Sequence, residues 1–152
     1  MRVYLTKDSD NLFQAVVVDD ATLNEQDAVR LYYDVNRNLG DPDEEDRLIE
    51  VFRNGVLNVY HGRGSNVDSL AWEPLATDTV VVEVGEPSNT QWALEMAIDT
   101  DSGLLDDGLM SPSNPYGIMA EFLFEGDSVA WPPGANIADA GTWSPIDNPS
   151  CG

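Results

Sequence analysis

The chemically most suggestive part of the sequence is residues 34–46, which read DVNRNLGDPDEED. Oxygen-bearing side chains occupy every second position where this acidic loop begins, so they can converge, and more carboxylates follow Gly40. Calcium takes about six to eight oxygen ligands from carboxylates, amide carbonyls and backbone carbonyls. We therefore predict that the acidic loop binds a structural calcium ion, with six candidate ligands: Asp34, Asn36, Asn38, Asp41, Asp43 and Asp46.

The same side chains have a second interpretation, because Asn and Asp readily hydrogen-bond the backbone of their own turns. The opening D-x-N-x-N resembles an EF-hand loop, but Leu39 stands where that loop requires glycine, and Gly40 comes one residue late. Arg37 also lies inside the run, and strand patterns flank it. Repulsion between close carboxylates favours an ion, although high salt weakens this effect. A calcium-bound loop between strands and a set of self-capping turns both remain open.

The four tryptophans are the second set of candidate functional residues. Sugars stack their C–H faces on aromatic rings and need a few polar groups nearby. Trp92 alternates with core positions and is expected in the core. Trp72 lies in a predicted loop, Trp131 directly before two prolines, and Trp143 in the C-terminal coil. We predict that these three contact a ligand, and that Trp72 and Trp131 lie close together in the site. Each could instead close one end of the fold.

Catalytic and zinc chemistry have little support. His61 is the only histidine and Cys151 the only cysteine, which is too few for the ligand sets that zinc usually takes. With 28 acidic residues, pairs of carboxylates that resemble a glycosidase site are inevitable and carry no information. No Ser-His-Asp pattern or phosphate-binding loop is present, so we expect no enzyme.

Composition excludes two partner classes. The chain has 152 residues and a net charge of -21, with 28 acidic residues against 7 Lys and Arg, so binding to nucleic acid or anionic membranes is not expected. No stretch approaches the ~20 apolar residues of a membrane span, so we expect no membrane insertion. The acidity fits a high-salt habitat or a calcium-rich extracellular setting. Cys151 allows no internal disulfide, and a free thiol or a tether to another chain stays open.

The elements that must position these residues are strands, because hydrophobic residues alternate almost throughout. Residues 2–6, 11–19, 28–34, 79–84, 91–99 and 117–131 show this alternation, and Asn54-Gly55 predicts a type I′ hairpin between two further strands. We predict a single all-β domain over residues 1–152, an antiparallel β-sandwich of about eight or nine strands, jelly-roll or immunoglobulin-like, with a coil-rich C-terminal segment. The domain is expected to belong to a longer secreted protein.

The order of these segments resembles a known group of β-sandwiches. AVRLYYDVN leads into the acidic loop and the Asn-Gly hairpin, and WALEMAID resembles the W-x-x-E-x-x-I strand of DOMON-like domains and family 9 carbohydrate-binding modules. YGIMAEFLF and WPPGANIADAGTW resemble later segments of the same group. The resemblance implies sugar binding, haem binding or an uncharacterised extracellular role, because the fold alone does not select the function.

Together these features predict a non-catalytic, extracellular, calcium-stabilised module whose partner is a carbohydrate or another extracellular protein. One alternative is a structural or adhesive module of a surface assembly without a small ligand. The resemblance adds a haem-b electron-transfer domain, which we do not favour. Its axial ligands would come from the methionines together with the histidine or the single lysine: Met96, Met110 or Met119 with His61 or Lys7.

Overall fold

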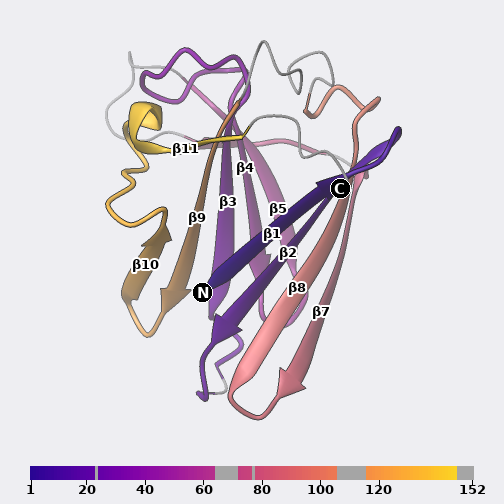
Figure 1. The fold of residues 1–152 in the computed structure, drawn as a ribbon, viewed down its shortest axis with the longest axis vertical. Coiled ribbons are helices and arrows are strands. Elements are labelled where there is room, and N and C mark those ends of the chain that lie inside the picture. Colours follow the sequence, from indigo (N-terminus) through magenta and orange to yellow (C-terminus); the bar gives the residue numbers. More distant parts are fainter. Residues whose placement is uncertain (23, 64–71, 77, 106–115, 147–152) are drawn as a thin grey trace.

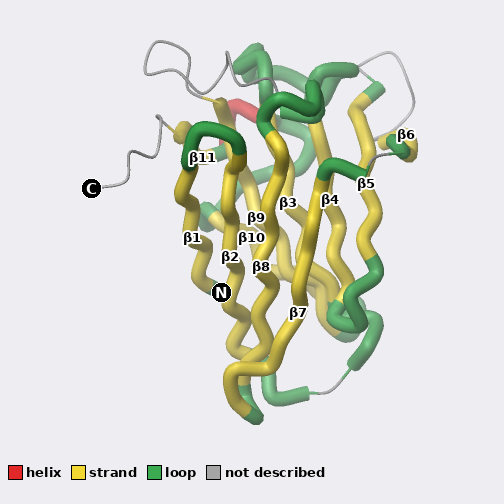
Figure 2. Tube along the Cα trace, turned by 90° about the vertical axis from the view of Figure 1, so that its right-hand side faces the viewer, coloured by secondary structure: helices red, strands yellow, loops and turns green. Residues whose placement is uncertain are grey.

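The computed structural model describes residues 1–22, 24–63, 72–76, 78–105 and 116–146, which form two antiparallel sheets lying as two layers (Figures 1 and 2). One sheet has four strands, in the order β1 (Arg2–Lys7), β2 (Asn11–Asp19), β8 (Gln91–Asp99) and β7 (Val80–Ser88). The other has seven: β10 (Asp127–Trp131), β9 (Tyr116–Phe124), β3 (Ala28–Asp34), β4 (Arg47–Phe52), β5 (Leu57–Gly62) and β6 (Trp72–Pro74), with β11 (Ser144–Ile146) also paired to β9.

The predicted antiparallel β-sandwich is confirmed, because period-two alternation gives each strand one apolar face. The described residues contain eleven strands rather than eight or nine, since β6 and β11 are three-residue strands that the alternation does not reveal. The main core lies between the sheets. There Trp92 is fully buried, as expected, and its ring centroid lies 6.0 Å from that of Phe122 on the opposite sheet.

A second cluster covers part of the outer face of the seven-stranded sheet. Tyr32, Leu48 and Met119 project outward there, and the segment 132–146 packs over them with Ala140 and Trp143. The Trp143 indole donates to the Asn136 carbonyl at 2.8 Å. This part of the predicted C-terminal coil therefore packs on the sandwich, whereas residues 147–152, with Cys151, lie outside the described residues.

The hairpin at Asn54-Gly55 differs from the predicted turn type. At Asn54-Gly55 only Gly55 has a positive φ, +85°, and the Gly55 amide donates to the Phe52 carbonyl at 2.8 Å. This is a three-residue loop that ends in a left-handed glycine, not the predicted type I′ turn. The two-residue turn with two positive φ angles is Glu125-Gly126, at 48° and 86°.

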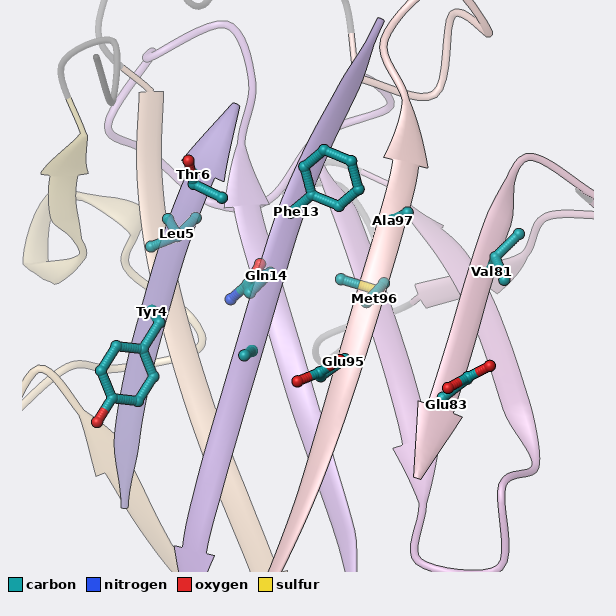
Figure 3. A pocket seen from close by; sticks show the side chains of 11 residues that line it. Tyr4, Leu5, Thr6, Phe13, Gln14, Val81, Glu83, Glu95, Met96 and Ala97 are labelled. Carbon is teal, nitrogen blue, oxygen red and sulfur yellow. The ribbon is translucent and has the colours of Figure 1, made fainter. Parts of the chain in front are cut away.

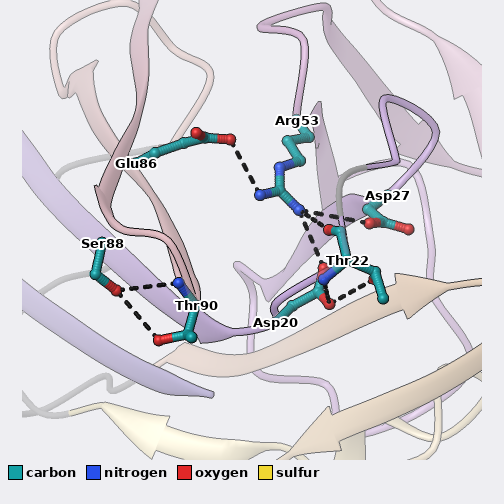
Figure 4. A network of polar contacts seen from close by, with 7 residues as sticks. All are labelled: Asp20, Thr22, Asp27, Arg53, Glu86, Ser88 and Thr90. Carbon is teal, nitrogen blue, oxygen red and sulfur yellow. Dashed lines mark hydrogen bonds and ion pairs between the residues drawn. The ribbon is translucent and has the colours of Figure 1, made fainter.

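Arg53, just after β4, joins the two sheets at one end of the sandwich (Figure 4). Its side chain is 8% exposed, and its guanidinium lies 3.1 Å from Asp20, which follows β2, and 3.0 Å from Glu86 in β7. A third carboxylate, Asp27, lies 3.8 Å away, and the cation stands 5.8 Å from the Trp92 ring centroid. One cation therefore contacts the β2–β3 connection and both sheets.

Candidate functional site

The acidic loop connects β3 to β4 and contains two fully buried carboxylates, Asp34 and Asp46. Asp46 accepts hydrogen bonds from the backbone amides of Val35 at 3.2 Å and Asp43 at 2.8 Å. Asp34 accepts one from the Leu39 amide through Oδ2, whereas its buried Oδ1 has no hydrogen-bond partner in the structure. Asp34 Oδ1 is therefore the oxygen of this loop that a cation could satisfy.

Electrostatics in the loop favour a bound proton or cation. Burial raises the pKa of Asp34 above its ordinary value. Burial also raises the pKa of Asp46 to about 7, and the charges of Asp34 and Asp43 contribute to that rise although backbone hydrogen bonds oppose it. The two carboxylates are therefore costly to ionise together.

The other candidate ligands mostly cap turns. Asn36 Oδ1 accepts from the Asn38 amide at 3.0 Å, Asn38 Oδ1 from the Gly40 amide at 3.0 Å, and Asp43 Oδ1 from the Glu45 amide at 2.9 Å. Both Asn side chains also donate to Asp43 Oδ2. Asp41 is exposed, and no group of three or more potential His, Cys, Asp or Glu ligands gathers among the described residues. The self-capping interpretation thus accounts for Asn36, Asn38 and Asp43.

The structure groups the tryptophans differently from the predicted Trp72–Trp131 pair. Trp72 and Trp143 both contact Tyr32 in the second cluster, each at a ring-centroid distance of 5.8 Å. Trp131 pairs with Ala120 in register, which places it on the inward side of the sheet against the main core. Trp143 is 2% exposed, so within this cluster only Trp72 is a partly exposed tryptophan.

Sequence reasoning missed a row of polar side chains that crosses the outer face of the seven-stranded sheet. Register places Glu121, Arg30, Glu50 and Asn58 side by side on β9, β3, β4 and β5. We call this row, together with the outward aromatic side chains beside it, the Arg30 site: Arg30, Glu50, Asn58, Glu121, Tyr32, Tyr60 and Trp72.

Hydrogen bonds hold the Arg30 site rigid. Arg30 Nε donates to Glu50 Oε1 at 2.8 Å, and Arg30 Nη1 lies 3.8 Å from Glu121 Oε2. Asn58 and Tyr60 donate to the second oxygen of Glu50, at 3.1 Å and 3.4 Å. Tyr32 donates to Glu121 at 2.9 Å. Each polar side chain of the row is thereby oriented by at least one of its neighbours.

Exposure decides which groups a ligand can reach. The Arg30 side chain is 35% exposed, whereas the side chains of Glu50 and Glu121 are 8% and 12% exposed. Burial is the largest influence on the pKa of Arg30 and would lower it, but the hydrogen bond to Glu50 and the charges of Tyr32, Glu50 and Glu121 together outweigh burial and raise the pKa. Burial raises the pKa of Tyr60, and Glu50 raises it further, so its hydroxyl stays a neutral donor and acceptor. Next to them, a hollow of about 440 Å³ is lined by Asn58, Tyr60 and Pro74 among others.

The residues considered as haem ligands lie either in the hydrophobic clusters or near the surface. Met96 is buried in the main core and Met119 in the second cluster, while Met110 lies outside the described residues. His61 Nδ1 lies 2.9 Å from the Gly62 carbonyl, and its Nε2 lies 3.7 Å from Glu73. Lys7 ends strand β1 of the other sheet.

Within the described part of the chain, no helix is long and apolar enough to cross a membrane.

Comparison with known proteins identifies the fold. No family model matches the sequence, and no curated protein matches it. A family 9 carbohydrate-binding module from Caldicellulosiruptor kristjanssonii, solved with glucose, superposes with a TM-score of 0.65 at 15% identity over 95% of this chain and 74% of that chain. Its cellotriose complex gives 0.64 at 14% identity over 94% and 71%. The chain has the β-sandwich fold of family 9 carbohydrate-binding modules, as the sequence resemblance predicted.

Proposed function

We propose that this chain is a non-catalytic, extracellular carbohydrate-binding module, and that the Arg30 site holds the sugar. The observation that carries the proposal is the cross-strand row of Glu121, Arg30, Glu50 and Asn58 beside the partly exposed ring of Trp72. The fold of two sugar complexes, of glucose and of cellotriose, supports it.

The chemistry of the site suits a neutral polyol. Vicinal hydroxyls can accept from the partly exposed guanidinium of Arg30 while they exchange hydrogen bonds with Tyr60 and Asn58. The Trp72 ring offers a face or edge for sugar C–H groups. Because the cross-strand hydrogen bonds already orient these side chains, binding costs little additional side-chain entropy.

Calorimetric titration with glucose and cellotriose, preceded by a glycan array, tests the sugar site. We expect Trp72→Ala to weaken binding at least tenfold and Tyr60→Phe about threefold to tenfold, since one hydrogen bond contributes roughly 0.5–1.5 kcal/mol. Tyr4→Phe is the matched control, because it removes a phenol hydroxyl from the outer face of the other sheet.

Two outcomes would reject the sugar site. Binding that survives both Trp72→Ala and Tyr60→Phe would place the ligand elsewhere. Failure of the wild-type chain to bind any glycan would favour the alternative of a structural or adhesive module.

We also propose that the acidic loop binds a structural calcium ion through Asp34 and Asp46. The unpartnered, buried Oδ1 of Asp34 supports this, and a divalent cation would let both carboxylates ionise. Arg37 is the competing cation: its charge acts on Asp34, and a Cβ at Gly117 would lie 2.8 Å from its Nη1. When bound, calcium would fasten the loop to the strand ends and take no part in chemistry.

Thermal melts in calcium chloride and in EDTA test the ion. We expect calcium to raise the Tm of the wild-type chain, because a ligand at about 100 times its Kd adds roughly 2.7 kcal/mol to the free energy of unfolding. Asp34→Asn should lose this rise, whereas Asp41→Asn, at an exposed position, should keep it. Equal Tm values in calcium and EDTA would mean that Arg37 and the turns suffice.

A further inference from the structure

The outer face of the four-stranded sheet carries a shallow hollow of about 420 Å³ (Figure 3). Its floor is formed where the two central strands, β2 and β8, present small side chains, Ala15 and Ala97. Larger side chains rise on both sides: Tyr4 and Phe13 from β1 and β2, and Val81 from β7. The hollow, which we call the groove, therefore lies between side chains of β1, β2 and β7, on the sheet opposite the Arg30 site.

The groove exposes three large apolar or aromatic side chains to solvent. Tyr4 is 53% exposed, Phe13 37% and Val81 65%. In register, Phe13, Ala97 and Val81 form one continuous apolar row across β2, β8 and β7. Contiguous exposed apolar patches are uncommon on soluble proteins, and large ones mark binding surfaces.

Two carboxylates stand directly opposite each other in the next row of the groove. Glu95 on β8 pairs in register with Glu83 on β7, and both side chains lie on the outer face (Figure 3). Neither forms an ion pair with any other residue that the structure describes. Like charges directly opposite on neighbouring strands destabilise a sheet, so a cation between them would relieve the cost.

We propose that this groove docks a polypeptide segment of a partner protein in which Lys or Arg is flanked by apolar side chains. The apolar row receives the apolar side chains, and the Glu83–Glu95 pair receives the cation. Charge complementarity selects this occupant over a second copy of the chain, whose net charge of -21 repels its own kind. The proposal does not depend on the sugar site, because the two sites lie on opposite sheets.

A synthetic peptide of alternating Leu and Lys, titrated by calorimetry in 150 mM NaCl, probes the groove. We expect Glu83→Gln/Glu95→Gln to weaken binding at least tenfold and Phe13→Ser about tenfold. The charge-matched control Glu25→Gln/Glu44→Gln, at exposed positions outside the groove, should change affinity less than twofold. A peptide of alternating Ser and Lys should bind at least tenfold more weakly than the Leu-Lys peptide.

Four outcomes would overturn the docking proposal. Equal losses in the groove and control double variants, or equal binding of both peptides, would show non-specific attraction to an acidic protein. Loss of glycan binding in Phe13→Ser with unchanged binding in Tyr60→Phe would make the groove a sugar site. Self-association that Phe13→Ser abolishes would make it an interface between copies. The Glu→Gln pair is isosteric and relieves repulsion, so misfolding cannot explain its loss of binding.

Discussion

Asp27 is a buried carboxylate whose surroundings disfavour its charge. Its side chain is fully buried, and neither oxygen has a hydrogen-bond partner, while Arg53, 3.8 Å away, is shared with Asp20 (Figure 4). Burial raises the pKa of Asp27, and the neighbouring charge of Asp20 raises it further. The folded chain therefore holds this proton more tightly than the unfolded chain. The stability contributed by Asp27 is complete below the unfolded pKa and is lost as pH rises through the folded pKa.

The variant Asp27→Asn should therefore be more stable than the wild type at pH 8, by roughly 1–2 kcal/mol, because the amide copies the protonated acid and removes an unsatisfied buried charge. The difference should shrink at pH 4, because the raised pKa keeps Asp27 more protonated there than an ordinary aspartate. Thermal melts at the two pH values measure this. Asp10→Asn, at an exposed position, is the control and should show no such pH-dependent gain. A variant less stable than the wild type at pH 8 would show that the attraction of Arg53 outweighs the burial cost.

At the scale of elements, the acidic loop depends on close backbone approach at glycine. A Cβ added to Gly62, the last residue of β5, would lie 2.3 Å from the Asp43 carbonyl oxygen. The Gly62 amide also donates to the Asp46 carbonyl at 3.2 Å. At the other side of the loop, a Cβ on Gly117 would meet Arg37 and Asp34. The loop is thus held against the ends of β5 and β9, whether or not calcium binds.

Gly62→Ala should destabilise the fold by at least 1–3 kcal/mol, roughly the cost of overpacking, because backbone and not a flexible side chain opposes the new methyl group. It should also reduce the calcium-dependent rise in Tm. Gly85→Ala, in strand β7, is the matched control, since a Cβ there meets no atom within 4 Å. Equal melting temperatures of the two alanine variants would contradict the close approach seen at Gly62.

At the scale of the whole molecule, the 28 acidic residues far outnumber the 7 basic ones. Several of the 7 basic residues are engaged by carboxylates, as Arg2, Arg30, Arg53 and Arg63 are in ion pairs. The remaining acidic excess repels itself and opposes the compact state. Salt screens this repulsion, because the Debye length falls from about 10 Å at 0.1 M to about 3 Å at 1 M.

The Tm at pH 8 should therefore rise by several degrees between 0.1 M and 1 M NaCl, with EDTA present in both samples to remove calcium effects. The same salt step near pH 4.1, the isoelectric point calculated from the sequence, should have much less effect because the net charge is close to zero. An equal rise at both pH values would assign the stabilisation to general salt effects on apolar burial.

Local pattern was enough to predict the strands. Residues 11–19, 28–34 and 91–99 form strands with the predicted bounds. The alternation of apolar and polar residues is visible in the local sequence, and it gives each strand an apolar face that the sandwich buries. The buried position of Trp92 follows from the same alternation. The three-residue strands β6 and β11 escaped prediction because partners distant in sequence, not their own residues, define them.

The sequence by itself therefore determined the fold class, the acidic surface and the loop that concentrates carboxylates. Only the tertiary structure decided which outward residues meet. The register of strand pairing brings Glu121 of β9 beside Arg30 of β3. The position of each tryptophan along its strand decides which face it lies on, so Trp131 faces inward and Trp72 faces outward. It also left Asp34 and Asp46 buried together while Asn36 and Asn38 cap turns. The physical reason is that cross-strand pairing joins residues tens of positions apart, and a shift of one residue in register would exchange the two faces of a strand.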